Sequence, residues 1–592
     1  MSDYCAPLKE MKFLVEQAVT AAGLQQIEAL ADFDMETVAA VLEAAGEFAN
    51  RGLAPLNSVG DEQGCRFADG KVTTPEGWKA AYDQFCQDGW MGLALPADFG
   101  GQQLPKFIAQ PVNEMWHSAN LSFVMFHALV QGCSQILLKF GTEEQKSRYI
   151  EKMISGEWTA AMSLTEPGAG SDLGELKTRA TPHDKGQYII KGQKIYISYG
   201  EHDLTKNKIH FVLARTPDAP EGSRGISLFA VPTYRINKDG SLGESNDVIC
   251  TGIERKTGLH GSPTCSISYG DNDACLGELI GEENHGLAAM FILMNEARLS
   301  VGLQGVALGE LAYQKAVEYA LERTQGAHYE TKERCVPIVQ HPDVTRLLLT
   351  IKSQVFAQRS LGYLVAALVD KSEYSQDEAE KEALEARIAL LTPVFKAFST
   401  EQANLMAGSA IQVFGGMGFV EETGVAQIMR DARITTIYEG TTGIQAKDLL
   451  FRKILGDQGV ALESLLEEIE GTADKLKAEQ SLAPLGHNLS RALEAMHQTA
   501  TQIRQSTDLL QFNAGSVALL EALGLLTSAW QLSESALRAK MALESGEDPR
   551  FHRNIIALLE FHDAHLLPQL HARLMTFRRA ASGIAAYSFA AY

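Results

Sequence analysis

Two glycine-rich segments contain the side chains best suited to chemistry. In the first, SLTEPGAGSDLGELKT (residues 163–178), three glycines surround Thr165 and Ser171. Glycine permits close approach of the backbone, so exposed N–H groups there could hold a phosphate or the edge of a flavin. The segment matches neither a Walker A loop nor a placed GxGxxG fingerprint. Its spacing alone therefore favours a turn-rich domain entrance over a ligand site.

The second segment, VFGGMGFVEETGVAQIMRDARITTIYEGTTGIQ (residues 413–445), carries a carboxylate in a loop. Glu439 precedes Gly440 and a helix that we expect to begin at Thr441 or Thr442. Burial in a partly apolar loop would raise the pKa of this carboxylate and make it a competent base. The alternative is that Glu439 only complements the dipole of the next helix. Spacing alone favours that alternative.

Two other groups of side chains give weaker signals. Arg323 and Gln325 could bind a diphosphate, because a guanidinium suits that anion, although a solvated helix end is the simpler interpretation. Three histidines near the C-terminus could suggest a metal, but no carboxylate–histidine pattern accompanies them. We expect no metal site and interpret these residues as surface or capping residues: His562, His565 and His571.

The composition is that of a soluble multidomain protein. The chain has 592 residues, 45% of them hydrophobic, and a formal net charge of -22. This length is too great for one core. The acidic balance argues against non-specific nucleic-acid binding, which needs a basic surface. The eight cysteines include no CxxC pair, so we expect neither a disulfide framework nor a zinc finger, and a reducing cytoplasm is the simplest compartment.

We expect no signal peptide and no integral membrane segment. The N-terminus lacks a basic region followed by an apolar one. Residues 509–530 are apolar and about long enough to cross a bilayer, but Glu521 and several polar residues interrupt them. A buried bundle helix is the better interpretation, and peripheral membrane contact stays open.

The periodicity of apolar residues predicts four domains in the order α, β, α, α. Helical spacing dominates residues 1–160, short β-type runs fill 161–285, and helix returns over 286–455 and 456–592. The clearest expected elements are helices over 113–140, 286–323, 343–370 and 380–413, the last broken by Gly408, and strands over 188–198, 209–214 and 225–232.

Taken in this order, the segments resemble the acyl-CoA dehydrogenase family. GWMGLALPADFGG (residues 89–101) is similar to its first signature loop, SLTEPGAGSD to its flavin-contacting signature and GQKIYIS (192–198) to the strand that stacks on the flavin. QVFGGMGF and MRDARITTIYEGTTGIQ, within 412–445, are similar to its second signature. The resemblance covers roughly residues 40–455. It implies an α+β fold with an N-terminal α domain, a middle β-barrel-like domain, a C-terminal four-helix bundle and an additional helical domain.

The resemblance implies an FAD-dependent enzyme of β-oxidation. It would convert a fatty acyl-CoA, preferably of medium to long straight chain, to the trans-2-enoyl-CoA and pass electrons to electron-transfer flavoprotein. Glu439 would remove the α-proton, and its backbone N–H would polarise the thioester carbonyl. Some relatives carry the base directly before the residue equivalent to Arg298, but Ala297 stands there in this chain.

The other site residues follow from the same motifs. Tyr196 and Ser198 stand where Trp and Thr are usual, and they keep an aromatic face and a hydroxyl. Arg323, Gln325 and residues 412–416 would reach the flavin of a neighbouring subunit. The implied cofactor contacts are Met162, Leu164, Thr165, Gly170, Ser171, Tyr196, Ile197, Ser198, Arg323, Gln325, Gln412, Gly415, Gly416, Thr441 and Gly443. The implied substrate contacts are Ser171, Asn295, Arg298 and Gly440.

Several related activities compete with this interpretation. The additional C-terminal domain resembles a bacterial branch that includes 3-methylmercaptopropionyl-CoA dehydrogenases, although the plain GAGS residues favour an ordinary fatty acyl-CoA. An acyl-CoA oxidase would use the same base, whereas a flavin monooxygenase of this fold usually lacks it. A DNA-binding relative would need a basic C-terminal domain, and residues 456–592 carry 16 acidic and 11 basic residues. The extra domain would cover a face that other members use to form tetramers, so we predict a homodimer.

Overall fold

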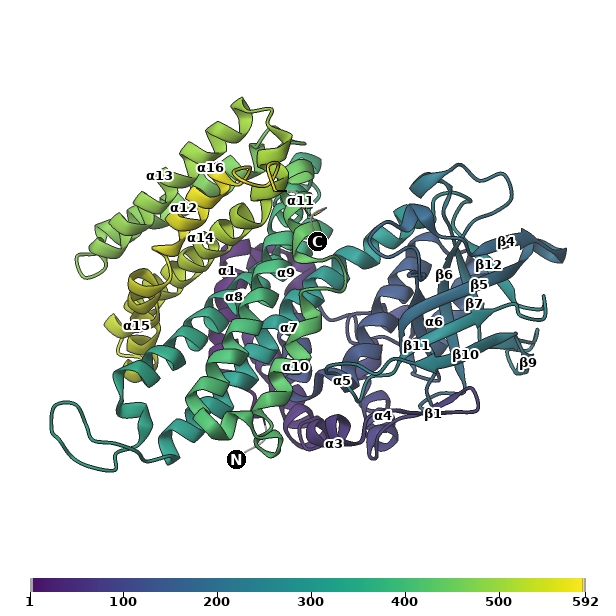
Figure 1. Cartoon of the computed structure of the whole chain (residues 1–592), viewed down its shortest axis with the longest axis horizontal. Coiled ribbons are helices and arrows are strands. Elements are labelled where there is room, and N and C mark those ends of the chain that lie inside the picture. The colour runs from purple at the N-terminus through teal and green to yellow at the C-terminus, as the bar shows by residue number, and fades with distance from the viewer. Residues whose placement is uncertain (1–3, 588, 590–592) are drawn as a thin grey trace. The chain divides into compact units, whose positions relative to one another are not determined.

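The described part of the chain, residues 4–587 and 589 of a computed structural model, packs as two units (Figure 1). Unit 1 contains Met1–Gly46, Lys106–Ser118 and Arg298–Tyr592, and unit 2 contains Glu47–Pro105 and Ala119–Ala297. Neither unit is continuous in sequence. The first 46 residues pack with the C-terminal helices rather than with the segment that follows them.

Within the described residues, unit 2 is built on a sheet of eight strands. The strand order is β10-β11-β5-β12-β7-β6-β3, with β4 beside β5; β3 and β6 pair in parallel and the other pairs are antiparallel. β6 and β7 are buried along their whole length, which explains their continuous apolar runs. The strands are β3 (Trp158–Ser163), β4 (Arg179–Pro182), β5 (Gln187–Ser198), β6 (Asn207–Ala214), β7 (Ser227–Pro232), β10 (Val248–Ile253), β11 (Thr264–Tyr269) and β12 (Leu276–Ile280).

The three strands expected from the sequence are confirmed as β5, β6 and β7. Short hairpins and helices complete unit 2, and the long apolar helix expected over 113–140 is present but longer. That helix is interrupted at Asn120, whose side-chain oxygen accepts the N–H of Phe123 at 3.0 Å and so caps the second part. The long helix is α5 (Lys106–Phe140), whose residues up to Ser118 belong to unit 1. The other elements of unit 2 are α3 (Leu56–Gln63), α4 (Trp78–Gln87), α6 (Glu143–Ile154), and the hairpins β1 (Arg66–Ala68) with β2 (Lys71–Thr73) and β8 (Tyr234–Ile236) with β9 (Leu242–Ser245).

The bundle of unit 1 confirms the other expected helices with one correction. α8 (Pro342–Tyr374) and α9 (Glu378–Phe414) pack along each other, and α7 (Gly286–Glu322) precedes them in the chain. The break predicted at Gly408 is wrong, because α9 continues through it to Phe414. An isolated glycine costs a helix only about 1 kcal/mol, which the burial of α9 in the bundle outweighs.

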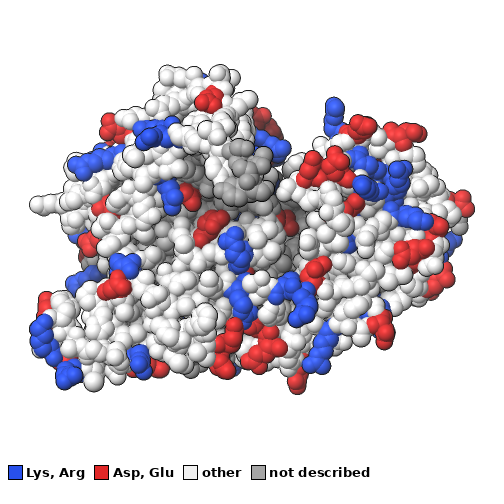
Figure 2. Space-filling model, viewed as in Figure 1, with Lys and Arg blue, Asp and Glu red and all other residues white. Residues whose placement is uncertain are grey.

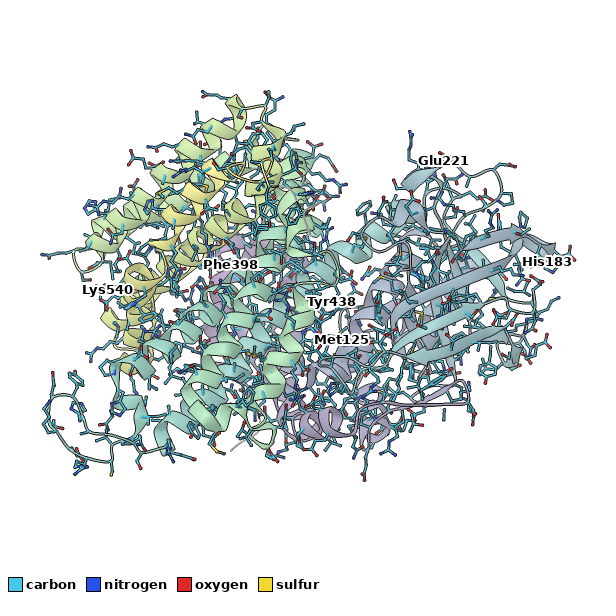
Figure 3. The ribbon with its side chains drawn as sticks, viewed as in Figure 1. Met125, His183, Glu221, Phe398, Tyr438 and Lys540 are labelled. Atoms are coloured by element: carbon cyan, nitrogen blue, oxygen red, sulfur yellow. The ribbon has the colours of Figure 1, made fainter. Side chains whose placement is uncertain are left out.

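Five helices form the C-terminal part of unit 1, and α14 (Leu509–Glu544) packs against α15 and α16 (Figure 1). α14 also meets α9, where a Cβ added to Gly524 would lie 2.2 Å from the ring of Phe398 (Figure 3). This close approach requires glycine. The other four helices are α12 (Val460–Ala478), α13 (Ala483–Gln505), α15 (Pro549–His565) and α16 (Gln569–Arg579).

Within the part of the chain that the structure describes, three helices, α5, α7 and α14, are long and apolar enough to cross a membrane by length and composition. In α14 the most apolar stretch is 61% buried inside the protein, as expected for a bundle helix. Acidic and basic side chains are interspersed over the face of the molecule shown in Figure 2.

The interpretation of the C-terminal histidines needs one correction. His562 is fully buried in α15, where desolvation lowers its pKa to about 3. It is therefore not a surface or capping residue, because the helix turns it towards the apolar interior. His565 stacks on Phe561 with 4.3 Å between ring centroids, and His571 is exposed.

A buried cluster of charges joins the N-terminal helix α1 (Leu8–Ala22) to the bundle. Arg359 of α8 is fully buried, and its guanidinium forms ion pairs with Glu10 of α1, Glu114 of α5 and Glu310 of α7. Lys352 adds a second cation, 2.8 Å from Glu10. Burial raises the pKa of Glu114, and the charge of Arg359 opposes that rise. The cluster therefore depends on its central arginine.

A chain of neutral hydrogen bonds connects α1 to α8 and α14. Gln17 donates to the Ser360 hydroxyl at 3.1 Å, and that hydroxyl donates to Gln531 at 2.7 Å. Ser535 donates back to Gln17 at 2.8 Å. All four side chains are buried, so their mutual bonding removes the cost of burying polar groups. α1 is thus an integral part of the C-terminal half.

Candidate active site

In unit 2, a buried ion pair shapes the glycine-rich loop that follows β3. Lys194 of β5 is fully buried, and its Nζ donates to the backbone oxygen of Leu164 at 2.9 Å and to Glu166 at 2.8 Å. Glu166 also accepts the backbone N–H groups of Lys177, at 2.6 Å, and Thr178, at 3.0 Å. The start and end of the loop are therefore tied to one pair of charges.

The electrostatics of this pair are those of a desolvated salt bridge. Desolvation lowers the pKa of Lys194 to about 8, although the negative charge of Glu166 opposes the effect. The pKa of Glu166 lies below its usual value, because the charge of Lys194 and the surrounding donors outweigh its own desolvation. Both groups are thus mainly charged at neutral pH, and each is stabilised by the other.

A β-bulge presents the ring of Tyr196 to solvent. Across β5 and β11, Ile197 pairs with Cys265 and Lys194 with Ile267, so two residues of β5 face one of β11. Tyr196 adopts a left-handed backbone (φ 61°), and its side chain is 60% exposed. The side chain of Ile197 lies in the apolar core of the sheet, so the cofactor contact expected of this residue would be made by its backbone.

The loop beside this strand is open. A Cβ added to Gly168 or Gly170 would meet no atom within 4 Å, and Ser171 is exposed. Leu164 and Thr165 are partly buried, and the Thr165 oxygen accepts the N–H of Ile195 at 2.9 Å. The exposed ring of Tyr196, the free space above the glycine backbone and the loop edge that is hydrogen-bonded to β5 together suit a flat cofactor that carries a diphosphate.

In unit 1, Glu439 lies in the loop between α10 (Val425–Thr435) and α11 (Thr442–Lys447). The hydroxyl of Thr441 caps α11 by accepting the N–H of Ile444 at 3.3 Å, which confirms the expected helix start. Glu439 (φ 54°) and Gly440 (φ 94°) are consecutive left-handed residues. This backbone conformation is uncommon for a residue other than glycine, and such strain clusters at functional sites.

The side chains of Lys396 and Gln445 hold this strained backbone by hydrogen bonds to its carbonyl oxygens. Lys396 of α9 donates from Nζ to the backbone oxygens of Thr435, at 3.0 Å, and Gly440, at 2.7 Å. Gln445 donates to the backbone oxygen of Glu439 at 3.1 Å. Tyr438 (Figure 3), next to Glu439, donates its hydroxyl to Gln304. The loop is therefore fixed on both sides of the carboxylate.

The environment of Glu439 favours a basic carboxylate. The side chain is partly buried, and desolvation raises its pKa, while the charges of Lys396 and Arg298 limit the rise. Arg298 of α7 is buried and forms an ion pair with Asp448 at 2.9 Å. Among the described residues its Nε has no hydrogen-bond partner. A raised pKa makes a carboxylate a stronger base when it is ionised.

The remaining expected residues are distributed over both units, on helices, strands and the segments that follow them. Arg323 and Gln325 are exposed just after α7, with 3.5 Å between Nη2 and Oε1. Gln412, Gly415 and Gly416 are exposed at the end of α9. Partly buried are Met162 on β3, Ser198 at the end of β5, and Thr441 and Gly443 at the start of α11, whereas the side chain of Asn295 lies outside the described residues.

Known families match almost the whole chain. The acyl-CoA dehydrogenase N-terminal domain matches residues 35–157, the middle domain 161–271 and the C-terminal domain 284–454. An acetyl-CoA dehydrogenase C-terminal like domain matches residues 465–587. The chain belongs to the acyl-CoA dehydrogenase family. The fold class predicted from the sequence, with its additional C-terminal helical region, is thereby confirmed.

Named relatives of this acyl-CoA dehydrogenase align over nearly their full length. The 3-methylmercaptopropionyl-CoA dehydrogenase of Ruegeria pomeroyi is 41% identical over 96% of this chain and 97% of its own. A butyryl-CoA dehydrogenase of Syntrophomonas wolfei is 35% identical over 97% of both. The structure of Caenorhabditis elegans ACDH-11 in complex with C11-CoA superposes with a TM-score of 0.77 at 20% identity, covering 98% of this chain and 95% of that one.

Acyl-CoA dehydrogenases use FAD, so the open loop and exposed Tyr196 ring of unit 2 have a fitting ligand. We expect Lys194→Met to lower the FAD retained per protomer by at least about tenfold, because buried Glu166 would lose its counter-charge and the loop its anchor. Flavin absorbance after gel filtration measures this. Lys208→Met, which breaks the other buried lysine–glutamate pair of unit 2 (2.6 Å to Glu201), is the control. Equal flavin loss in both variants would contradict the prediction.

Proposed function

We propose that this acyl-CoA dehydrogenase uses Glu439 as the base that removes the α-proton of its CoA thioester substrate. The observation that carries the proposal is the carboxylate itself, partly buried with a raised pKa in a left-handed loop held by Lys396 and Gln445. Geometry that is strained and fixed at one carboxylate is typical of a catalytic loop.

The reaction separates a proton and a hydride from adjacent carbons. Glu439 takes the α-proton, and its backbone N–H polarises the thioester carbonyl, which acidifies the α-C–H. FAD, when bound, supplies the acceptor for the hydride of the β-carbon, and the product is the trans-2-enoyl-CoA. We propose Leu164, Thr165, Ser171 and Tyr196 as the FAD contacts of unit 2, with Tyr196 stacking on the flat ring.

The proposed substrate is a straight-chain fatty acyl-CoA, preferably of medium to long chain, in β-oxidation. The butyryl-CoA dehydrogenase relative supports a straight chain, and the C11-CoA bound in the C. elegans structure supports a longer one. A second candidate is 3-methylmercaptopropionyl-CoA, which the 41% identity to the Ruegeria enzyme favours. Both candidates undergo the same α,β-dehydrogenation.

A matched pair of thioesters separates these candidates. Pentanoyl-CoA and 3-methylmercaptopropionyl-CoA have chains of equal atom number, and they differ in a methylene replaced by sulfur. The purified holoenzyme is mixed anaerobically with each of them and with longer straight-chain acyl-CoAs, and bleaching of the flavin band is followed. We expect faster bleaching by straight chains, with rates that rise beyond pentanoyl-CoA. A faster rate with the thioether would contradict the straight-chain proposal and select the second candidate.

We further propose a cytoplasmic homodimer that passes electrons to electron-transfer flavoprotein. The exposed Gln412, Gly415 and Gly416 at the end of α9 support a contact with the flavin of a second subunit. Sedimentation equilibrium tests the assembly, and a mass of four protomers would contradict it. Rapid reoxidation by oxygen, without a protein acceptor, would instead identify an oxidase.

A further inference from the structure

Lys396 is a fully buried lysine in the interior of α9, between Phe395 and Ala397, which are also buried. Lysine is rarely buried without a partner, because desolvating an ammonium is costly. Its Nζ donates to two backbone oxygens, those of Thr435 and Gly440. These oxygens lie at the two ends of the loop that carries Glu439, so a single ammonium joins both ends.

The ammonium is held by carbonyl groups rather than by a carboxylate. Among the described residues, Lys396 forms no ion pair, whereas Lys352, a partly buried lysine of α8, pairs with Glu10 at 2.8 Å and Glu310 at 3.5 Å. Desolvation lowers the pKa of Lys396 to about 8, so it is still mainly charged at neutral pH. Its charge is therefore not neutralised by a direct partner.

Charged groups face this loop from three other elements. Arg298 of α7 is paired with Asp448, which follows α11. Glu401 of α9 accepts the hydroxyl of Thr442 at 2.5 Å and, with Glu439, favours the charged form of Lys396. The Tyr438 hydroxyl is neutral, since burial raises its pKa. Lys396 and Arg298 are thus the two cations that act on Glu439, and Arg298 has its own counter-ion.

We propose that Lys396 is a positioning residue for Glu439: its ammonium fixes the left-handed Glu439–Gly440 backbone, and its charge sets the pH range in which the Glu439 carboxylate is ionised. This inference rests on the proposed role of Glu439 as the base. The backbone bonds orient both the carboxylate and the N–H that would polarise the thioester. The charge then determines how much of the carboxylate is available as a base at a given pH.

The direction of the effect follows from the sign of the charge. Burial raises the pKa of Glu439, and the positive charge of Lys396 lowers it. Removing that charge therefore raises the pKa further, so a smaller fraction of Glu439 is ionised at neutral pH. The acidic limb of the pH–rate profile should move to higher pH. A purely structural loss would lower the rate equally at every pH.

The test uses two variants of the holoenzyme and one control. Lys396→Gln keeps an amide that can donate to the two carbonyls but removes the charge, and Lys396→Met removes both. Lys352→Met removes a partly buried lysine of the same bundle that pairs with Glu10 and Glu310 instead of the loop. The rate of anaerobic flavin reduction by the acyl-CoA that bleaches wild type fastest is measured against pH. Flavin content and thermal transition are recorded for each protein.

We expect the acidic limb of both Lys396 variants to move alkaline by about one pH unit, equivalent to about tenfold in rate below the limb. Lys396→Met should lose additional rate at all pH values, and Lys352→Met should keep the wild-type limb. An unshifted limb in Lys396→Gln would overturn the proposal. So would failure of both Lys396 variants to fold while Lys352→Met folds, because Lys396 would then be a folding determinant.

The outcome is distinguishable from a failure of the proposed function. If Glu439→Gln retains normal flavin reduction, Glu439 is not the base and both proposals fall. If Glu439→Gln is inactive but the limb of the Lys396 variants is unmoved, only the positioning role is wrong. The two results come from separate variants assayed in the same way.

Discussion

Replacing Glu439 by glutamine is expected to slow flavin reduction by acyl-CoA by about 10²–10⁴-fold, the range typical for loss of a catalytic base. Glutamine has nearly the same shape, and the Glu439 backbone oxygen can still accept the Gln445 amide. The variant should therefore remain yellow and still perturb its flavin spectrum on binding acyl-CoA. Anaerobic stopped-flow absorbance measures binding and reduction in one experiment.

The control for this prediction is Glu296→Gln. Glu296 precedes Ala297, and by the family resemblance some relatives carry the catalytic base at the position of Ala297. Adjacent helical residues point about 100° apart, so Glu296 should face in another direction. We expect this variant to reduce its flavin at close to the wild-type rate. Fast reduction in Glu439→Gln together with slow reduction in Glu296→Gln would move the base to α7 and refute the assignment.

Replacing Arg359 by methionine is expected to destabilise unit 1 by about 3–5 kcal/mol, because it removes one member of a buried ion-pair network. Glu10 and Glu310 would then keep the partly buried Lys352, whereas Glu114 would lose the cation with which it pairs. The midpoint of urea unfolding should fall accordingly, and amide exchange in α1 should become faster.

The matched control is Arg346→Met on the same helix. Arg346 pairs with Asp343 at 2.8 Å, but both side chains are exposed, so the loss of stability should not exceed about 1 kcal/mol.

The pH dependence of stability provides a second check on the Arg359 prediction. Without Arg359, the pKa of Glu114 rises further, and a raised folded-state pKa gives stability that is lost as pH increases. The loss of stability caused by Arg359→Met should therefore become smaller at acidic pH. Equal urea midpoints for Arg359→Met and Arg346→Met would contradict the prediction.

Periodicity predicted the regular elements of this protein well. β5, β6 and β7 and the long helices α7, α8 and α9 follow directly from apolar spacing, and the start of α11 follows from its capping threonine. The two errors concern single residues. Gly408 does not end α9 and His562 is not at the surface, because in both cases packing outweighs the local preference of the residue.

The candidate site was only partly predictable. Spacing alone favoured a helix-dipole role for Glu439, and the resemblance to a family supplied its catalytic role. Lys396 and Lys194 were not identified, although Lys396 is a lone lysine within the apolar run VFKAF and Lys194 lies within the predicted strand 188–198. Their partners lie about 30 to 44 residues away, for example Leu164 and Gly440, so only the folded chain shows what they hold. The bulge at Tyr196 is likewise a property of strand pairing and not of composition.

The division of the sequence into four consecutive domains stays a prediction. The two packed units do not follow the order of the chain, because Met1–Gly46 belongs with Arg298–Tyr592. No local pattern in the first residues indicates this. Glu10 and Gln17 have ordinary helical positions, and their partners Arg359 and Ser535 are 349 and 518 residues further on.

The position of α1 has a consequence for biosynthesis. α1 is synthesised well before its partners, because its counter-charge lies in α8 and its hydrogen-bond partner Ser535 lies in α14. Until then Glu10 and Gln17 must remain hydrated, and the apolar face of α1 has no permanent cover. The nascent chain therefore carries α1 without its main packing partner until α8 has been made, and without its last hydrogen-bond partner until α14 has been made. A nonsense mutation before α8 would leave α1 without its main docking surface, and one between α8 and α14 would still remove Ser535, the partner of Gln17.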